Sequence, residues 1–230
     1  ADNNTGVGYR ALYQNTTGTR NAAFGGFALD AATTSNDNTA VGYAALTSTT
    51  TGAENTAVGS GALDQNTTGT DNTVVGWRAM YNNNGNYNTA VGNYALYANT
   101  TAHDNTALGY LALSANTTGA NNVGVGVSAL ASNTTASGNT AIGAFCLDTN
   151  TTGASNVAIG FYTMKANTTA SNNAALGYSA LRFNTTGASN VAVGYYSLRE
   201  NTTGSGSVAI GFEALTAATT GGQNVAVGYR

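Results

Sequence analysis

Hydrophobic and polar positions recur along the chain with a period of 17 residues. Each repeat contains an apolar residue followed by glycine, and the fourteen glycines are Gly8, Gly25, Gly42, Gly59, Gly76, Gly92, Gly109, Gly126, Gly143, Gly160, Gly177, Gly194, Gly211 and Gly228. Twelve of the thirteen intervals are 17 residues long, and the interval from Gly76 to Gly92 is 16. This regular register predicts one repeat array over residues 1–230.

The positions around each glycine predict short strands joined by turns. Asn stands four residues before it in 13 of the 14 repeats, Leu or Met stands four after, and Asn-Thr-Thr-Gly or a variant follows. Seventeen residues are too few for a helical-hairpin repeat but suit one coil of a β-solenoid. We therefore expect an all-β, parallel β-solenoid of about 13 or 14 rungs, with equivalent residues stacked about 4.8 Å apart.

The apolar rows predict a thin core, and the Asn row predicts side-chain amides stacked from rung to rung inside a turn. The predicted core residues are Val41, Leu46, Val58, Leu63, Val91, Leu96, Ile142, Leu147 and Ile159. Small residues occupy the glycine position and the position two residues before it. Alternate residues of a strand point to the same face, so these small residues share a face and allow another backbone to approach it closely. They indicate either an interface between chains or a tightly packed interior, and the interface candidates are Ala40, Gly42, Ala57, Gly59, Ala90 and Gly92.

The position after the glycine is aromatic in nine of the fourteen repeats, for example Tyr43, Trp77 and Tyr178. A row of this kind predicts ring stacking along the sheet, and the alternative is an exposed stripe for a ligand or partner. The stripe is interrupted at Gly26, Ser60, Asn93, Val127 and Ala144.

Composition and charge exclude several classes of protein. Only 17 of 230 residues are charged, and the net charge of −3 offers no electrostatic surface for nucleic acid or an anionic membrane. A single cysteine excludes a disulfide framework, and no apolar run is long enough to span a membrane. No catalytic constellation is present, since His103 falls in a turn and Cys146 replaces a small core residue. We expect no enzyme activity and no cofactor.

Two features of the turns are candidates for ligands or modification. Asp37, Glu54 and Asp71 share one turn position in successive rungs, and their mutual repulsion suggests a weak Ca²⁺ site, although Arg20 precedes them in the same row. Apart from this set we expect no metal. The Asn-Thr-Thr turns also contain N-glycosylation sequons, although turn geometry alone explains them equally; the candidates for covalent glycans are Asn15, Asn66, Asn99, Asn116, Asn133, Asn150, Asn167, Asn184 and Asn201.

The segments from Asn88 to Leu96 and from Asn156 to Gly160 resemble the head repeats of trimeric autotransporter adhesins. They are also similar to the repetitive shafts of phage tail fibres and bacterial surface fibres. The repeat here is longer than the typical head repeat, and the extra residues fall in the Asn-Thr-Thr-Gly turn. The resemblance implies a left-handed parallel β-roll that assembles as a trimer.

Together these features predict a structural or adhesive segment of an extracellular fibre, at a cell surface or in a virion tail fibre. The repeat pattern lacks capping elements, so we expect a continuing chain or self-association, as a trimer or a head-to-tail filament. A cell-surface glycan or receptor is a further expected partner. The alternatives are an ice-binding protein using the Thr rows and a carbohydrate-binding solenoid using the aromatic stripe.

Overall fold

The computed structural model describes residues 1–230 and contains fourteen three-residue strands and no helix. The chain forms two compact units, Ala1–Thr118 and Gly119–Arg230. The first unit contains β1 (Thr5–Val7), β2 (Ala22–Phe24), β3 (Thr39–Val41), β4 (Thr56–Val58), β5 (Thr73–Val75), β6 (Thr89–Val91) and β7 (Thr106–Leu108). The second contains β8 (Val123–Val125), β9 (Thr140–Ile142), β10 (Val157–Ile159), β11 (Ala174–Leu176), β12 (Val191–Val193), β13 (Val208–Ile210) and β14 (Val225–Val227).

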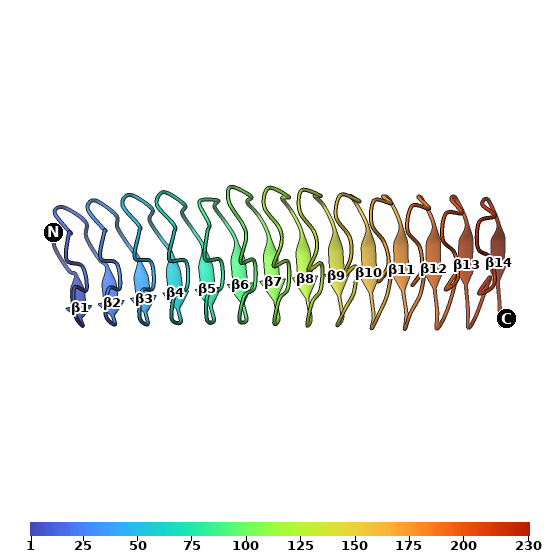
Figure 1. The fold of residues 1–230 in the computed structure, drawn as a ribbon, viewed down its shortest axis with the longest axis horizontal. Coiled ribbons are helices and arrows are strands. Elements are labelled where there is room, and N and C mark those ends of the chain that lie inside the picture. The colour runs from blue at the N-terminus through green and yellow to red at the C-terminus, as the bar shows by residue number, and fades with distance from the viewer. The chain divides into compact units, whose positions relative to one another are not determined.

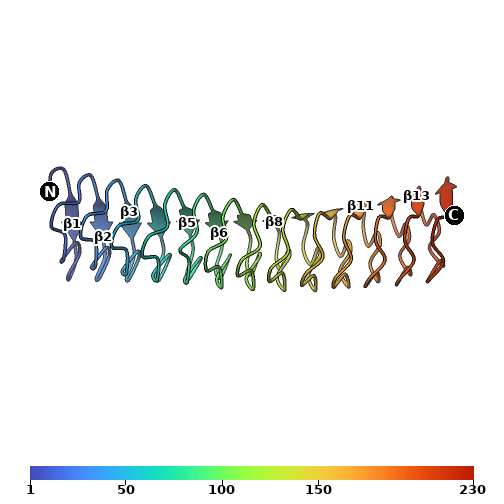
Figure 2. The same ribbon diagram turned by 90° about the horizontal axis from the view of Figure 1, so that it is seen from above.

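Within each unit the strands pair in parallel and in chain order, and equivalent residues of successive rungs are partners. Ala40 pairs with Ala57 in the first unit, and Ala192 pairs with Ala209 in the second. Within each unit, Figure 1 shows each strand beside the next, and Figure 2 shows the rest of each rung on one side of the strands. The predicted all-β parallel solenoid is therefore confirmed.

Main-chain hydrogen bonds between rungs continue far beyond the strands. The N–H of Leu46 donates to the carbonyl of Ala62 at 3.1 Å, and the N–H of Glu54 donates to Asn36 at 3.1 Å. Because the bonds recur around the coil, most of the backbone polar groups of a rung find partners in its neighbours. The sheet is thus only one part of the inter-rung contact.

The Ala-Leu segment after the glycine forms turns. Ala44 and Leu46 have φ angles of 55° and 52°, and equivalent residues in the other rungs are also left-handed. A non-glycine residue in this region costs on the order of 1–2 kcal/mol. The tight path turns the Leu side chain inward, where burial offsets part of that cost.

The interior is built around the Leu row, and this half of the predicted core is confirmed. Leu46, Leu63, Leu96 and Leu147 have no exposed surface. The prediction for the strand residue before the glycine is wrong. A three-residue strand points only its middle residue inward, so the residues on either side of it face out. In this outward row Val41, Val91 and Ile142 are exposed, and Val58 and Ile159 are half-buried.

For the predicted interface residues the structure favours the alternative, a tightly packed interior, since the three alanines are buried and the three glycines are half-buried. Ala40, Ala57 and Ala90 occupy the inward strand position and are fully buried. The glycines Gly42, Gly59 and Gly92 serve a close approach between rungs of one chain. For example, Gly42 has φ 135°, and a Cβ there would lie 2.6 Å from the carbonyl oxygen of Gly59.

The rung between Gly76 and Gly92 is one residue shorter at its turn, and a side chain compensates for the missing residue. The rung that starts at Gly59 has the full length, and there the main-chain carbonyl of Thr67 accepts from the N–H groups of Thr50 and Thr51 of the preceding rung, at 3.1 and 3.2 Å. In the shorter rung the Oδ1 of Asn84 takes this role, accepting from the N–H groups of Thr67 and Thr68 at 2.7 and 3.2 Å. The inter-rung bonding is thereby preserved.

Candidate functional site

Two rows of Asn side chains run through the interior. The predicted row, four residues before the glycine, is confirmed: the Nδ2 of Asn55 donates to Asn38 Oδ1 at 3.2 Å and to the carbonyl of Gly69 at 2.8 Å. A second row begins each Asn-Thr-Thr turn. In it, the Nδ2 of Asn150 donates to Asn133 Oδ1 at 3.0 Å and to the carbonyl of Gly153 at 2.9 Å.

The second row contains the predicted glycosylation sites, and the prediction is wrong for eight of the nine in the folded chain. The buried residues are Asn66, Asn99, Asn116, Asn133, Asn150, Asn167, Asn184 and Asn201, whereas Asn15 is half-buried. A glycan replaces a proton of the Nδ2 atom, and this atom lies against the interior of the solenoid with no room for a sugar. Ala32, which takes the same rung position and is also buried, is the signal in the sequence that this row faces inward.

The three carboxylates proposed for Ca²⁺ do not form one site. Asp37 turns to Arg20, whose Nε lies 2.6 Å from its Oδ1. Glu54 instead hydrogen-bonds to Asp71, and this bond, followed by the charge of Asp71, raises the pKa of Glu54. No group of three or more His, Cys, Asp or Glu side chains is placed to hold a metal ion. The calcium prediction is therefore wrong, because Asp37 is ion-paired with Arg20 and the three carboxylates do not converge on one point.

The single histidine and the single cysteine lie where the sequence predicts. His103 is exposed in a turn, with its Nδ1 2.6 Å from Asp104 Oδ2. Cys146 is fully buried, and its Sγ donates to the carbonyl of Ala158 at 3.1 Å. Burial raises the pKa of the Cys146 thiol to about 12, so the thiol stays protonated at neutral pH.

The outward face of the strands carries a continuous row of large apolar side chains in each unit. The row consists of the third strand residue, and its members include Phe24, Leu108, Leu176 and Ile210, which are 36–48% exposed. No Lys, Arg, Asp or Glu occurs in any strand. We call this surface the strand face; it is apolar, uncharged and repeated at every rung.

The aromatic residues after the glycine stack along the second unit, which confirms the predicted ring stacking. Phe161, Tyr178, Tyr195, Phe212 and Tyr229 are joined by centroid distances of 5.1–5.7 Å, with neighbouring planes within 20°. Each inner ring therefore has its two faces directed toward neighbouring rings. The row presents mainly ring edges to solvent and gives few open faces on which a sugar could stack.

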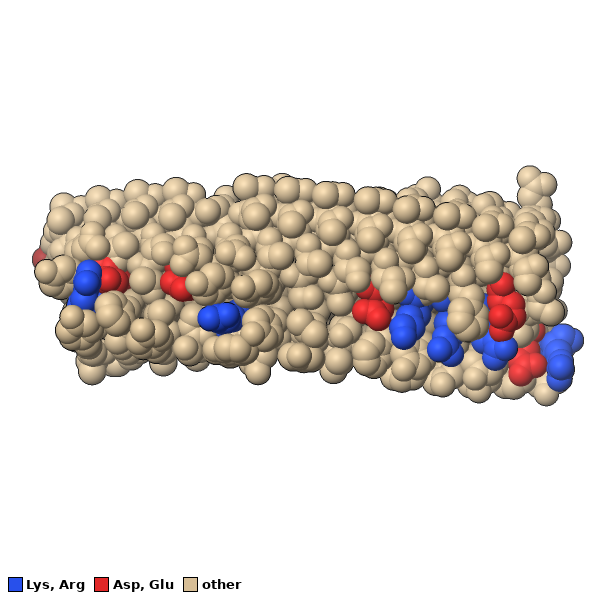
Figure 3. Space-filling view, viewed as in Figure 1, with Lys and Arg blue, Asp and Glu red and all other residues tan.

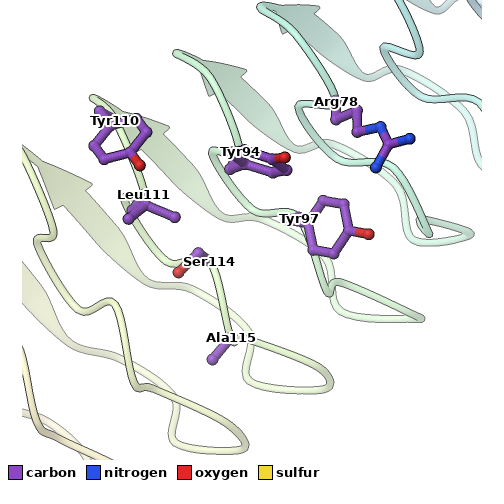
Figure 4. A pocket seen from close by; sticks show the side chains of 7 residues that line it. All are labelled: Arg78, Tyr94, Tyr97, Tyr110, Leu111, Ser114 and Ala115. Atoms are coloured by element: carbon purple, nitrogen blue, oxygen red, sulfur yellow. The ribbon is translucent and has the colours of Figure 1, made fainter.

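An aromatic row of the first unit ends at a hollow of about 340 Å³, shown in Figure 4. Tyr81 stacks on Tyr97 at 5.7 Å, but the next rung has Ser114 at the same position. The small residue leaves space beside the Tyr97 ring. The hollow is lined by Arg78, Tyr94, Tyr97, Tyr110, Leu111, Ser114 and Ala115.

Basic side chains gather on one face of the second unit (Figure 3). Lys165, Arg182 and Arg199 each stand five residues after a repeat glycine, in three successive rungs. The Nζ of Lys165 and the Cζ of Arg182 both lie 4.8 Å from the ring centroid of Tyr162. Sequence reasoning missed this row, although its 17-residue spacing is visible in the sequence.

The fold is built from strands and turns alone, and it contains no helical segment that could span a membrane. No protein-family model matches the chain, and none of the curated proteins matches it either. What the structure shows is a repeat β-solenoid with rungs of 17 residues.

Proposed function

We propose that the chain is a structural segment of an extracellular fibre, in which copies associate side by side through the strand face. The observation that carries the proposal is the row of outward apolar side chains. Soluble monomers rarely expose large contiguous apolar patches, whereas assembly interfaces bury them. Here every rung adds one such side chain to the row, from β1 to β7 and again from β8 to β14.

A second copy of the chain is the partner that suits this face best. The strands contain no charge, so two identical faces meet without like-charge repulsion. The repeat also gives both partners the same spacing of apolar side chains. The resemblance to adhesin heads favours a trimer, and a head-to-tail filament is the alternative mode of self-association.

The fibre assignment places the chain outside the cell, at a cell surface or in a virion tail, and gives it no catalytic role. The protonated, buried thiol of Cys146 and the exposed turn position of His103 support that reading. The regular ladders of main-chain and Asn hydrogen bonds suit a mechanical element.

Ice binding gains no support from the Thr pairs of the turns. The first Thr of a pair uses its hydroxyl within the solenoid, since Thr151 donates to the carbonyl of Thr168 at 3.0 Å. The second Thr, such as Thr68, is exposed, whereas the first is half-buried in most rungs. The stacked aromatic row likewise does not favour a carbohydrate-binding platform over a structural role.

Sedimentation velocity of the full chain tests the proposal, because the strand face and the turns can be altered separately. Val41→Lys and Ile142→Lys place charges on the strand face, while Gln65→Lys adds the same charge at an exposed turn position. We expect the parent and Gln65→Lys to sediment as one oligomer and the two strand-face variants to dissociate with unchanged circular dichroism. A parent chain that stays monomeric at high concentration would overturn the proposal.

A further inference from the structure

The basic row of the second unit contains two cations without carboxylate partners. Arg199 is ion-paired with Glu200, its Nε lying 2.7 Å from Oε1. Neither Lys165 nor Arg182 has an acidic oxygen within ion-pair distance. Equivalent positions of neighbouring rungs lie about 4.8 Å apart, so like charges in one row repel. This repulsion is a cost that an anion between the two side chains would relieve.

The side chain of Arg182 also has an unused donor. Its Nε is shielded from solvent and has no hydrogen-bond partner. The guanidinium lies over the rings of Tyr162 and Phe183, with Cζ 4.8 and 5.0 Å from the centroids. These contacts hold the planar group in place, which reduces the entropy lost when an anion binds to it.

Lys165 and Arg182 line one hollow of about 370 Å³, together with Thr149, Ala166, Thr168 and Phe183. The exposed ring of Phe183 gives the hollow an apolar wall. Asp148 stands at the same rung position as Lys165, one rung earlier. Burial raises the pKa of Asp148, and the positive charge of Lys165 opposes that rise. The hollow thus combines two cations with an apolar surface.

We propose that this hollow binds the anionic group of an acidic saccharide, either a sulfate ester or a uronate carboxylate. The two cations receive the anionic group, and the apolar wall formed by Phe183 accepts the C–H face of the sugar ring. Because neighbouring rungs present cations at a regular spacing, a saccharide with a charge on successive units makes the most contacts. The choice of a saccharide rests on the proposed extracellular fibre, whereas the anion site rests on the side chains alone.

Nucleic acid suits the surface less well. The chain has a net charge of −3, and this row offers three cations of which one is already paired. Binding of nucleic acid depends on many phosphate contacts made by a strongly basic surface. A short single-stranded oligodeoxynucleotide therefore serves as a competing probe.

Calorimetry with the full chain tests the site, using a heparin octasaccharide, an oligogalacturonate octamer and neutral cello-oligosaccharide as probes. We expect at least one acidic probe to bind, more weakly as salt is raised, and the neutral probe not to bind. Binding of both acidic probes would show that a carboxylate is sufficient, and binding of heparin alone would identify sulfate as the required group.

Variants connect the binding to the two cations. Lys165→Gln with Arg182→Gln should weaken binding at least tenfold, and Lys165→Arg should retain it. Arg78→Gln is the matched control, because Arg78 is also unpaired and lies over aromatic rings but has no cation in the next rung. Circular dichroism confirms folding of each variant.

Three results would overturn the proposal: no binding of either acidic probe, unchanged binding by the double variant, or equally tight binding of the oligodeoxynucleotide. Sedimentation of the same samples separates this test from that of the fibre. A monomeric parent that binds heparin would leave the anion site standing while removing the fibre proposal. An oligomeric parent that binds neither acidic probe would remove the anion site and leave the fibre proposal standing.

Discussion

The main-chain N–H and the side-chain Nδ2 of Asn55 both donate to the Oδ1 of Asn38, at 3.0 and 3.2 Å. One buried oxygen therefore connects two rungs through two hydrogen bonds. Asn55 in turn accepts the N–H and the Nδ2 of Asn72 at 3.1 and 3.0 Å. The row works as a continuous chain of donors and acceptors, so the loss of one amide affects both neighbours.

Asn55→Ala should lower the free energy of unfolding by about 3–5 kcal/mol, because it leaves the main-chain N–H of Asn72 without an acceptor and removes one of two hydrogen bonds from both the Gly69 carbonyl and the Nδ2 of Asn72. Asn55→Ser should cost about half as much. Ser207 shows why, since its hydroxyl accepts the N–H of Asn224 at 3.2 Å. Urea unfolding at fixed concentration measures both, and equal losses for Ala and Ser would contradict this account.

Gly42→Ala should destabilise the chain by about 3 kcal/mol or more, since the backbone is left-handed and the new Cβ would meet the Gly59 carbonyl. Gly26→Ala is the matched control. A Cβ there would make an ordinary 3.6 Å contact with the Tyr43 ring, and the change should be neutral within about 0.5 kcal/mol. Thermal unfolding compares the two variants, and a stable Gly42→Ala protein would show that the rungs can separate at this point.

Glu54→Gln should raise stability at neutral pH. The hydrogen bond to Asp71 raises the pKa of Glu54, so folding favours the protonated form and stability falls as pH rises from the ordinary glutamate value through the raised one. The variant removes this decline, and its melting temperature should change less than the parent's between about pH 4 and 7.

Arg20→Gln should change stability at neutral pH in the direction opposite to Glu54→Gln. Arg20 lowers the pKa of Asp37, first through its hydrogen bond, so the pair stabilises the fold above the ordinary aspartate value and loses that effect in acid. Its removal should lower the melting temperature at neutral pH. Changes of the same sign in both variants would contradict the assigned pairing.

Cys146→Ala should protect the chain against alkali. Burial raises the pKa of the thiol to about 12, so an unfolded chain ionises first and stability is lost as pH rises from about 9 toward that value. Alanine occupies the same position in most rungs and carries no proton to lose. Urea midpoints across this pH range should diverge between parent and variant; parallel curves would show that the thiol is not shielded.

The period and the parallel stacking could be predicted because each rung must present its neighbour with the same groups at the same places. Gly42 and Asn55 repeat for that reason, and a single sequence reveals it. The inward side of a three-residue strand could not be predicted in the same way, because Ala57 and Val58 are both apolar. The Leu63 row already fills the interior, so the larger strand residue is the one left outside.

Polarity also misleads at the turns. Asn150 looks like a surface residue, yet it is fully buried because each of its amide groups finds a partner inside the turn or one rung away. The pairing of Lys165 with Arg182 in one hollow depends on side-chain directions that the spacing alone does not give. Their common rung position was nevertheless a signal available in the sequence.

The shortened rung has a consequence for how such a gene changes. Asn84 supplies from its side chain the oxygen that a main-chain carbonyl supplies elsewhere, so the loss of one codon in this turn leaves the hydrogen bonding to the neighbouring rung in place. Deletions elsewhere in a repeat would shift the Asn and Leu rows out of line. Recombination between repeats that differ in turn length should therefore yield folded products, and designers can use the same turn to insert or remove residues.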